Sequence, residues 1–134
     1  MPTIKSSYLG NLRTQSIHLQ SGTELLTDAP VDNNGKGEKF SPTDLVSSAL
    51  GSCMVTIMGI VAERNGVSLE GLTWEVTKVM QSSPRKIQEI VVDFQWEKPA
   101  EDPATLQKLK NAALTCPVAL SLDPAIRQTV NFNF

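Results

Sequence analysis

The sequence predicts an α+β fold, in which strands come in groups and do not alternate one by one with helices. Three short apolar–polar alternations precede one long helical pattern, two longer strands follow it, and a second helix and a last strand close the chain. Grouped strands favour antiparallel sheets over a doubly wound parallel sheet. The 134 residues, 40% apolar and 19% charged, suffice for one core, so we expect a single domain over residues 1–134.

The N-terminal third is predicted to form three short strands, at about residues 3–9, 13–20 and 24–28. Glycine and Ser-Gly pairs between them supply turns, which is typical of hairpins. The segment 29–40 that follows is rich in Asn, Gly and Lys and shows no periodicity. We therefore expect it to be a flexible loop.

One long helix is predicted over about residues 42–65. Pro42 suits the first helical position and Gly66 supplies the stop. The apolar arc of this helix is wide, which indicates that it is buried on most sides. Gly51 and Gly59 each cost about 1 kcal/mol relative to Ala in a helix interior, so we expect another backbone to approach closely there.

The C-terminal half is predicted to contain two longer strands, at about residues 69–81 and 86–97, with inward residues at period two. A helix over 104–115 ends at Cys116-Pro117, because proline cannot continue it. The closing segment 126–134 alternates apolar and polar residues and is predicted to form the last strand.

Composition and charge argue against several kinds of function. The net charge is −2 and the basic residues are scattered, so we expect no nucleic-acid binding. No uninterrupted apolar run approaches the length of a membrane span, and the N-terminus does not resemble a signal peptide, so we expect no membrane association and a cytoplasmic location. One histidine and two distant cysteines do not make a metal site, and we expect no cofactor.

The two cysteines carry the remaining chemical information. In the cytoplasm such a pair is more often catalytic, metal-binding or buried than a permanent disulfide. Cys53 lies on the apolar face of the long helix, too far from its N-terminus for activation by the macrodipole, and is an inert core residue unless another segment brings a cation. Cys116 precedes a proline at a helix end, where free backbone N–H groups would lower a thiol pKa, and a plain buried cysteine fits equally well.

Three segments together resemble the OsmC family, which includes osmotically inducible protein C and the organic hydroperoxide resistance proteins. They are SPTDLVSSALGSC at 41–53, AERNGVSLEGLTWEV at 62–76 and AALTCPVALSL at 112–122, and the resemblance runs along nearly the whole chain. It implies an OsmC-like intertwined homodimer, in which antiparallel sheets from both subunits wrap two long central helices. The small residues of SSALGS would then let the partner's long helix come close.

The resemblance also implies thiol-dependent reduction of organic hydroperoxides. Cys53 matches the peroxidatic position and Cys116 the resolving position, and an external dithiol would reduce the disulfide that they form. Arg13 matches the family arginine that activates the thiolate, through an opposite charge a few ångströms away. Three apolar residues are expected to wall the site and to favour an alkyl hydroperoxide: Phe40, Met54 and Ile57.

One position departs from the family's pattern. The characterised hydroperoxide reductases carry a glutamate directly after the helix-opening proline, where it holds the arginine, and this chain has Thr43 there. Asp44 is adjacent but lies about 100° further round the helix axis, so we do not expect it to take over. The arginine is then expected to be held less firmly, or by Glu38 or Asp28 instead.

Two other functions fit the same sequence. A non-catalytic OsmC-like dimer that binds a small apolar ligand at its interface would keep the fold without consuming hydroperoxide. A purely structural interpretation makes both cysteines core residues, whose loss would change stability alone. Hydroperoxide consumption by the wild type and by Cys53→Ser distinguishes a peroxidase from both.

Overall fold

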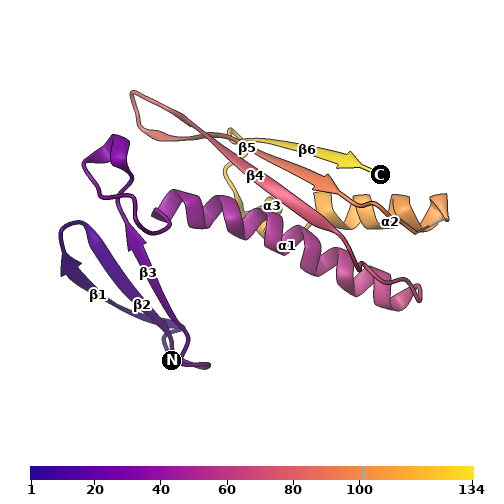
Figure 1. The fold of residues 1–134 in the computed structure, drawn as a ribbon, viewed down its shortest axis with the longest axis horizontal. Coiled ribbons are helices and arrows are strands. Elements are labelled where there is room, and N and C mark those ends of the chain that lie inside the picture. The colour runs from indigo at the N-terminus through magenta and orange to yellow at the C-terminus, as the bar shows by residue number, and fades with distance from the viewer. Residues whose placement is uncertain (101) are drawn as a thin grey trace. The chain divides into compact units, whose positions relative to one another are not determined.

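The structure, a computed structural model, describes residues 1–100 and 102–134 (Figure 1). The described residues form two three-stranded sheets and three α-helices, which confirms the α+β class. The chain divides into two compact units, Met1–Val46 and Ser47–Phe134, and the long helix α1 (Pro42–Arg64) runs across the division. The single domain expected over residues 1–134 stays a prediction.

The N-terminal unit is an antiparallel meander of the three predicted strands. They are β1 (Ile4–Gly10), β2 (Arg13–His18) and β3 (Glu24–Asp28), paired in the order β1-β2-β3. Most of β1 is exposed, and the buried residues of Met1–Val46 are all polar: Thr27, Asp28 and Ser41. This unit therefore lacks an apolar core of its own, although every one of its residues is described.

The segment between β3 and α1 is folded by local hydrogen bonds. It contains a short 3-10 helix, η1 (Val31–Asn33), and the Pro30 carbonyl accepts from the Gly35 N–H at 2.9 Å. The Ala29 N–H donates to the Leu12 carbonyl at 3.1 Å, which ties the segment back to the turn before β2. The expectation of a flexible loop without regular structure is therefore wrong for this part.

The C-terminal unit contains the second sheet, with β4 (Thr73–Gln81), β5 (Lys86–Gln95) and β6 (Arg127–Asn133) in that order. Strands β4 and β5 are antiparallel, as predicted, whereas β6 pairs with β5 in parallel. Helices α2 (Pro103–Leu114) and α3 (Pro117–Ser121) connect β5 to β6. A crossover of this length is what a parallel neighbour requires, so the added helix α3 explains the difference from the expected all-antiparallel pairing.

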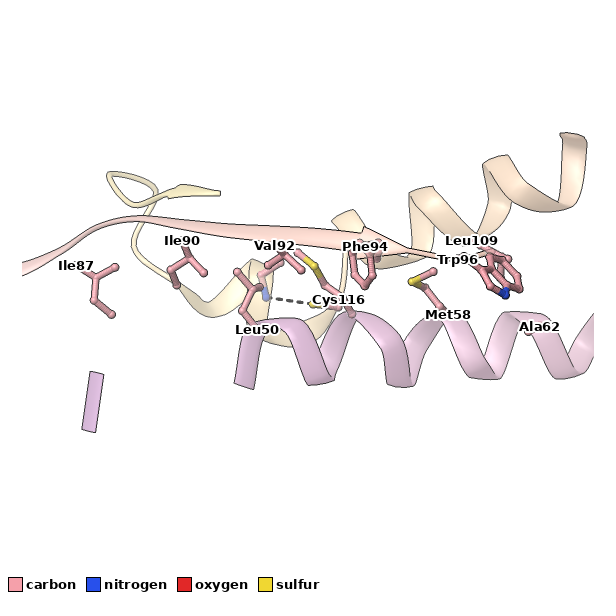
Figure 2. Packing of buried hydrophobic residues seen from close by; sticks show 13 residues of the cluster. Leu50, Met58, Ala62, Ile87, Ile90, Val92, Phe94, Trp96, Leu109 and Cys116 are labelled. Carbon is pink, nitrogen blue, oxygen red and sulfur yellow. Dashed lines mark hydrogen bonds between the residues drawn. The ribbon is translucent and has the colours of Figure 1, made fainter. Parts of the chain in front are cut away.

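The core of the C-terminal unit lies between α1 and the sheet (Figure 2). Buried apolar residues of α1 recur at every fourth position: Leu50, Met54, Met58 and Ala62. Buried residues of β5 recur at every second position: Ile90, Val92 and Phe94. The Phe94 ring stacks on Phe132 of β6 with 5.4 Å between ring centroids, so the helical and strand periods seen in the sequence meet in one cluster.

The two glycines inside α1 have different surroundings. A Cβ on Gly51 would lie 2.8 Å from Trp74 Nε1 and 3.1 Å from Val76 Cγ2, so side chains of β4 explain this glycine. The expectation that another backbone approaches Gly51 is therefore wrong within this chain, because the neighbouring atoms belong to side chains. A Cβ on Gly59 would meet only Leu69 Cδ1, at 3.9 Å, which is an ordinary contact. A close approach at Gly59 stays a prediction about a partner subunit.

Helix α1 is long and apolar enough to cross a membrane by length and composition, with a mean hydropathy of 2.0 over its most apolar window. A search for uninterrupted apolar runs does not find it, because Ser47, Ser48 and Ser52 interrupt the pattern. The core helix of a soluble protein passes the same test, and α1 contributes Met54 and Met58 to the core. The expected absence of membrane association stays a prediction.

Candidate functional site

The structure brings Cys53 and Cys116 together, although they come from different helices. Cys53 is half-buried in the middle of α1, and Cys116 is completely buried directly before α3. Cys53 packs against the buried cluster that contains Cys116, it is near enough to affect the pKa of the Cys116 thiol, and both are free thiols. The sequence alone placed both near apolar surfaces, and only the fold makes them neighbours.

Cys116 is held in place by its own local structure. It is the N-cap of α3, with extended backbone angles, and Pro117 occupies the first helical position. The Ala119 N–H donates to Cys116 Sγ at 3.4 Å. This contact, drawn as a dashed line in Figure 2, fixes the sulfur among the buried side chains between α1 and β5.

Burial raises the pKa of the Cys116 thiol. The N–H groups of Ala119 and Val118 act in the opposite direction, whereas the neighbouring Cys53 thiol raises the pKa further. The sulfur thus lies beside a helix-end N–H group, as one of the two alternatives from the sequence expected, but burial is the larger effect and the pKa is raised. Cys116 is therefore a protonated thiol at neutral pH, able to donate to the Cys53 sulfur.

Arg13 belongs to the N-terminal unit, where it opens β2 directly opposite Asp28 of β3. Its Nε donates to Asp28 Oδ1 at 2.6 Å and its Nη2 to Asp28 Oδ2 at 2.8 Å. Nη2 also donates to Glu38 Oε1 at 3.4 Å. Asp28 and Glu38 are the partners that the sequence offered for Arg13 in the absence of a carboxylate at position 43. The bidentate contact with Asp28 holds Arg13 firmly.

The Arg13–Asp28 pair is charged on both sides. The hydrogen bond from Arg13 lowers the pKa of Asp28 below its usual value, against the opposing effect of burial. The same hydrogen bond raises the pKa of Arg13. Both groups are therefore ionised at neutral pH.

A hollow of about 230 Å³ lies beside Arg13 in the N-terminal unit. Its lining includes a second cation, Lys36, together with residues from the end of β1 and the turn after it: Leu9, Gly10 and Asn11. Two cations at one hollow favour a polar or anionic group there.

Thr43 and Asp44 lie in the first turn of α1. The Ser41 N–H donates to Asp44 Oδ2 at 3.0 Å, and the Asp44 N–H donates to Ser41 Oγ at 3.1 Å. This reciprocal pair is a capping box, with Asp in the place of the usual Glu or Gln. Thr43 Oγ1 lies 3.3 Å from Ser41 Oγ. Asp44 thus serves the helix start, in line with the expectation that it does not replace the family glutamate.

The three apolar residues expected to wall the site differ in exposure. Met54 is completely buried in the core, Ile57 is half-buried against the same cluster, and Phe40 is 57% exposed. Met54 is therefore a packing residue of this chain. A wall formed by Phe40 and Ile57 stays a prediction.

A metal site is not formed by the part of the chain that the structure describes, where no three His, Cys, Asp or Glu side chains gather. The one histidine, His18, is exposed at the end of β2, with its Nδ1 2.6 Å from Ser21 Oγ.

Comparison with known proteins identifies the family. The family model described as OsmC-like protein matches residues 35–131, which is most of the chain. The chain belongs to the OsmC family. Solved structures with this fold include proteins named for osmotic stress and for organic hydroperoxide resistance. A comparison with curated proteins finds no match.

Solved structures of the OsmC type share the fold. A proposed osmotic stress induced and detoxification response protein from Psychrobacter arcticus 273-4 is 50% identical, with a TM-score of 0.94 over 99% of this chain and 96% of that one. The organic hydroperoxide resistance protein OsmC from Legionella pneumophila is 14% identical, with a TM-score of 0.76 over 100% and 98% of the two chains. The second likeness concerns the fold alone.

Proposed function

We propose that this OsmC-like protein reduces organic hydroperoxides, with Cys53 as the attacking thiol and Cys116 as the resolving thiol. The observation that carries the proposal is the pair of free thiols that α1 and the start of α3 bring into one buried cluster. Family membership supports the same chemistry, as does the detoxification response in the name of the 50% identical relative.

The different surroundings of the two thiols divide the work between them. Cys53 is the more exposed, so a substrate reaches it first, whereas Cys116 is buried and protonated. The Cys53 thiolate attacks the distal peroxide oxygen, the O–O bond breaks, and the alkoxide takes up a proton and leaves as the alcohol. Cys53 is left as a sulfenic acid.

The second step uses Cys116. Its sulfur attacks the Cys53 sulfenic acid, an S–S bond forms, and the hydroxyl leaves as water with the Cys116 proton. An external dithiol then reduces the disulfide and returns both thiols. The packing of Cys53 against the cluster that contains Cys116 supports this order, because a disulfide requires the two side chains to be neighbours.

Arg13 is the proposed activating cation. An opposite charge a few ångströms from Cys53 favours the thiolate form. Arg13 uses Nε and Nη2 for its carboxylate partners, so Nη1 is the guanidinium nitrogen left for a thiolate or a peroxide oxygen.

We further propose that the protein is an intertwined homodimer, located in the cytoplasm where thiols stay reduced. Both units expose large apolar side chains, among them Tyr8, Leu25, Ile60 and Leu120. The N-terminal sheet buries only polar residues of its own, so a second subunit is the proposed cover. Light scattering that gives a compact monomer at micromolar concentration contradicts this.

The test is consumption of tert-butyl hydroperoxide with dithiothreitol as the reductant. We expect turnover by the wild type, loss of turnover in Cys53→Ser, and slower turnover in Cys116→Ser, because dithiothreitol must then attack the Cys53 sulfenic acid in place of Cys116. Ser52→Ala, on the exposed neighbour of Cys53, is the matched control and should keep wild-type turnover. If the wild type consumes no hydroperoxide but is stabilised by an apolar ligand, the non-catalytic binding function replaces this proposal.

A further inference from the structure

Asp28 is a carboxylate almost completely shielded from solvent, with 2% of its side chain exposed. Both of its oxygens are used. Oδ1 accepts from Arg13 Nε, and Oδ2 accepts from Arg13 Nη2 and from the Glu38 N–H at 3.1 Å. A buried charge is tolerated when it is paired and hydrogen-bonded in this way, and two parallel bonds fix the plane of the guanidinium as well as its position.

Asp28 also joins three segments of the N-terminal unit. Its side chain pairs with β2 through Arg13 and with the chain before α1 through the Glu38 N–H. Its own N–H donates to the Phe40 carbonyl at 3.1 Å. A change at this carboxylate therefore moves Arg13 relative to the segment that leads into α1.

Glu38, the second carboxylate on Arg13, is a weaker candidate for the same task. Its side chain is 60% exposed, and its one contact with the guanidinium is 3.4 Å long. Exposed pairs of this kind contribute little, because solvent screens them and two flexible side chains must be ordered. Of the two carboxylates, Asp28 alone combines burial with a two-pronged contact.

We propose that Asp28 is the positioning residue that fixes Arg13 for the thiol reaction, the task for which position 43 of this chain has no carboxylate. The inference rests on the proposed peroxidase function. Asp28 touches neither thiol nor substrate in this account, and acts by holding the Nε and Nη2 edge of Arg13 so that Nη1 is presented in one orientation. Thr43→Glu should then bring little gain to the wild type, because Arg13 is already held.

The test compares charge-removing variants that differ only in place. Asp28→Asn should lower kcat/KM for the hydroperoxide and the alkylation rate of Cys53 by about 100-fold, the effect of misplacing a reacting group by about 1 Å. Glu38→Gln should change either rate by at most about two-fold, as for an exposed pair. Glu24→Gln removes the same charge from the other end of β3 and should leave both rates unchanged.

A double variant separates positioning from a structural role. If Asp28 acts through Arg13, then Asp28→Asn added to Arg13→Ala should slow Cys53 alkylation no further than Arg13→Ala alone. A structural defect would slow the double variant by the product of the two effects. A double variant that is slowed by the product of the two effects would overturn the inference. Wild-type rates in Asp28→Asn would overturn it as well.

The outcome also distinguishes this inference from the proposed function. Absence of Cys53-dependent turnover in the wild type overturns both, whereas an active wild type with an equally active Asp28→Asn overturns only the role of Asp28. If Asp28→Asn does not fold, Asp28→Glu replaces it. That variant keeps the charge on a longer side chain, so we expect a smaller loss in the Cys53 alkylation rate. Combined with Arg13→Ala, it should slow alkylation no further than Arg13→Ala alone. Slowing by the product of the two effects would overturn the inference here too.

Discussion

At the scale of the residue, the proposed chemistry depends on the contrast between two cysteines. Cys116 is buried, and its sulfur accepts a hydrogen bond from a backbone N–H. Its thiol pKa is raised, so the thiol is protonated at neutral pH. Cys53 is more exposed on α1 and is the sulfur proposed to meet the hydroperoxide. The proposal assigns attack and resolution to different residues because their surroundings differ.

The Asp28 carboxylate gives a pH prediction at the same scale. Its pKa is lowered in the folded protein, so its contribution to stability is complete above the unfolded value of about 3.9 and is lost as the pH falls through the folded value. We expect urea unfolding to show a constant stability difference between wild type and Asp28→Asn from neutral pH to about pH 5, and a shrinking difference below about pH 4. A difference that grows toward acid would contradict the pairing with Arg13.

Some of these site residues could be predicted from the sequence more directly than others. Arg13 and both cysteines were named from the family resemblance, and Asp28 only as one of two options for holding the arginine. The register of the β2–β3 hairpin would have selected Asp28 over Glu38, since Arg13 and Asp28 are directly opposite each other in it. The Cys53–Cys116 contact had no signal in the residues themselves, because it depends on how α1, α2 and α3 pack around one core.

At the scale of the element, α1 shows how a helix interior is adapted to a sheet. Gly51 lies against Trp74 and Val76 of β4, where a Cβ would be too close to both side chains. Gly59 has space for a Cβ within the chain. The two glycines of this helix therefore allow a direct comparison, because a Cβ would be crowded at Gly51 and would have space at Gly59.

Alanine substitutions at these glycines test that account. Gly51→Ala should lower the free energy of unfolding by about 1–3 kcal/mol, because overpacking outweighs the better helix propensity. Gly59→Ala should raise it by up to about 1 kcal/mol through propensity alone. Chemical denaturation measures both. A stabilising Gly51→Ala would refute the close packing against β4, and a destabilising Gly59→Ala would mean that a partner subunit lies against that position.

The elements themselves were largely predictable. The sequence patterns predicted β1 to β6, α1 and α2 close to their observed bounds. In α1 and β5 the pattern matches a face buried in the core, whereas β1 to β3 are delimited by turn residues and have no apolar core. The parallel pairing of β6 was missed, since strand direction depends on the α2–α3 crossover and leaves no mark in the strand's own alternation. The short helix α3 was missed as well, although Cys116-Pro117 marks its start.

At the scale of the whole molecule, the two compact units carry different parts of the proposed chemistry. The C-terminal unit holds both thiols in its core, and the N-terminal unit holds the Arg13–Asp28 pair on a sheet without apolar burial of its own. This distribution agrees with an OsmC-like dimer in which sheets from both subunits surround the long helices. The sequence predicted that assembly only through its family resemblance, because no single-chain pattern reports where a second subunit lies.

The most direct test of the central claim is the state of the two cysteines after one equivalent of tert-butyl hydroperoxide. Intact mass and a peptide map without reductant should show the loss of two hydrogens and one Cys53–Cys116 disulfide in the wild type. Cys116→Ser should instead give a Cys53 sulfenic acid that dimedone traps. The account predicts a disulfide that forms as fast as the hydroperoxide is consumed and that dithiothreitol reverses. Two free thiols after hydroperoxide has been consumed, or no consumption at all, would contradict it.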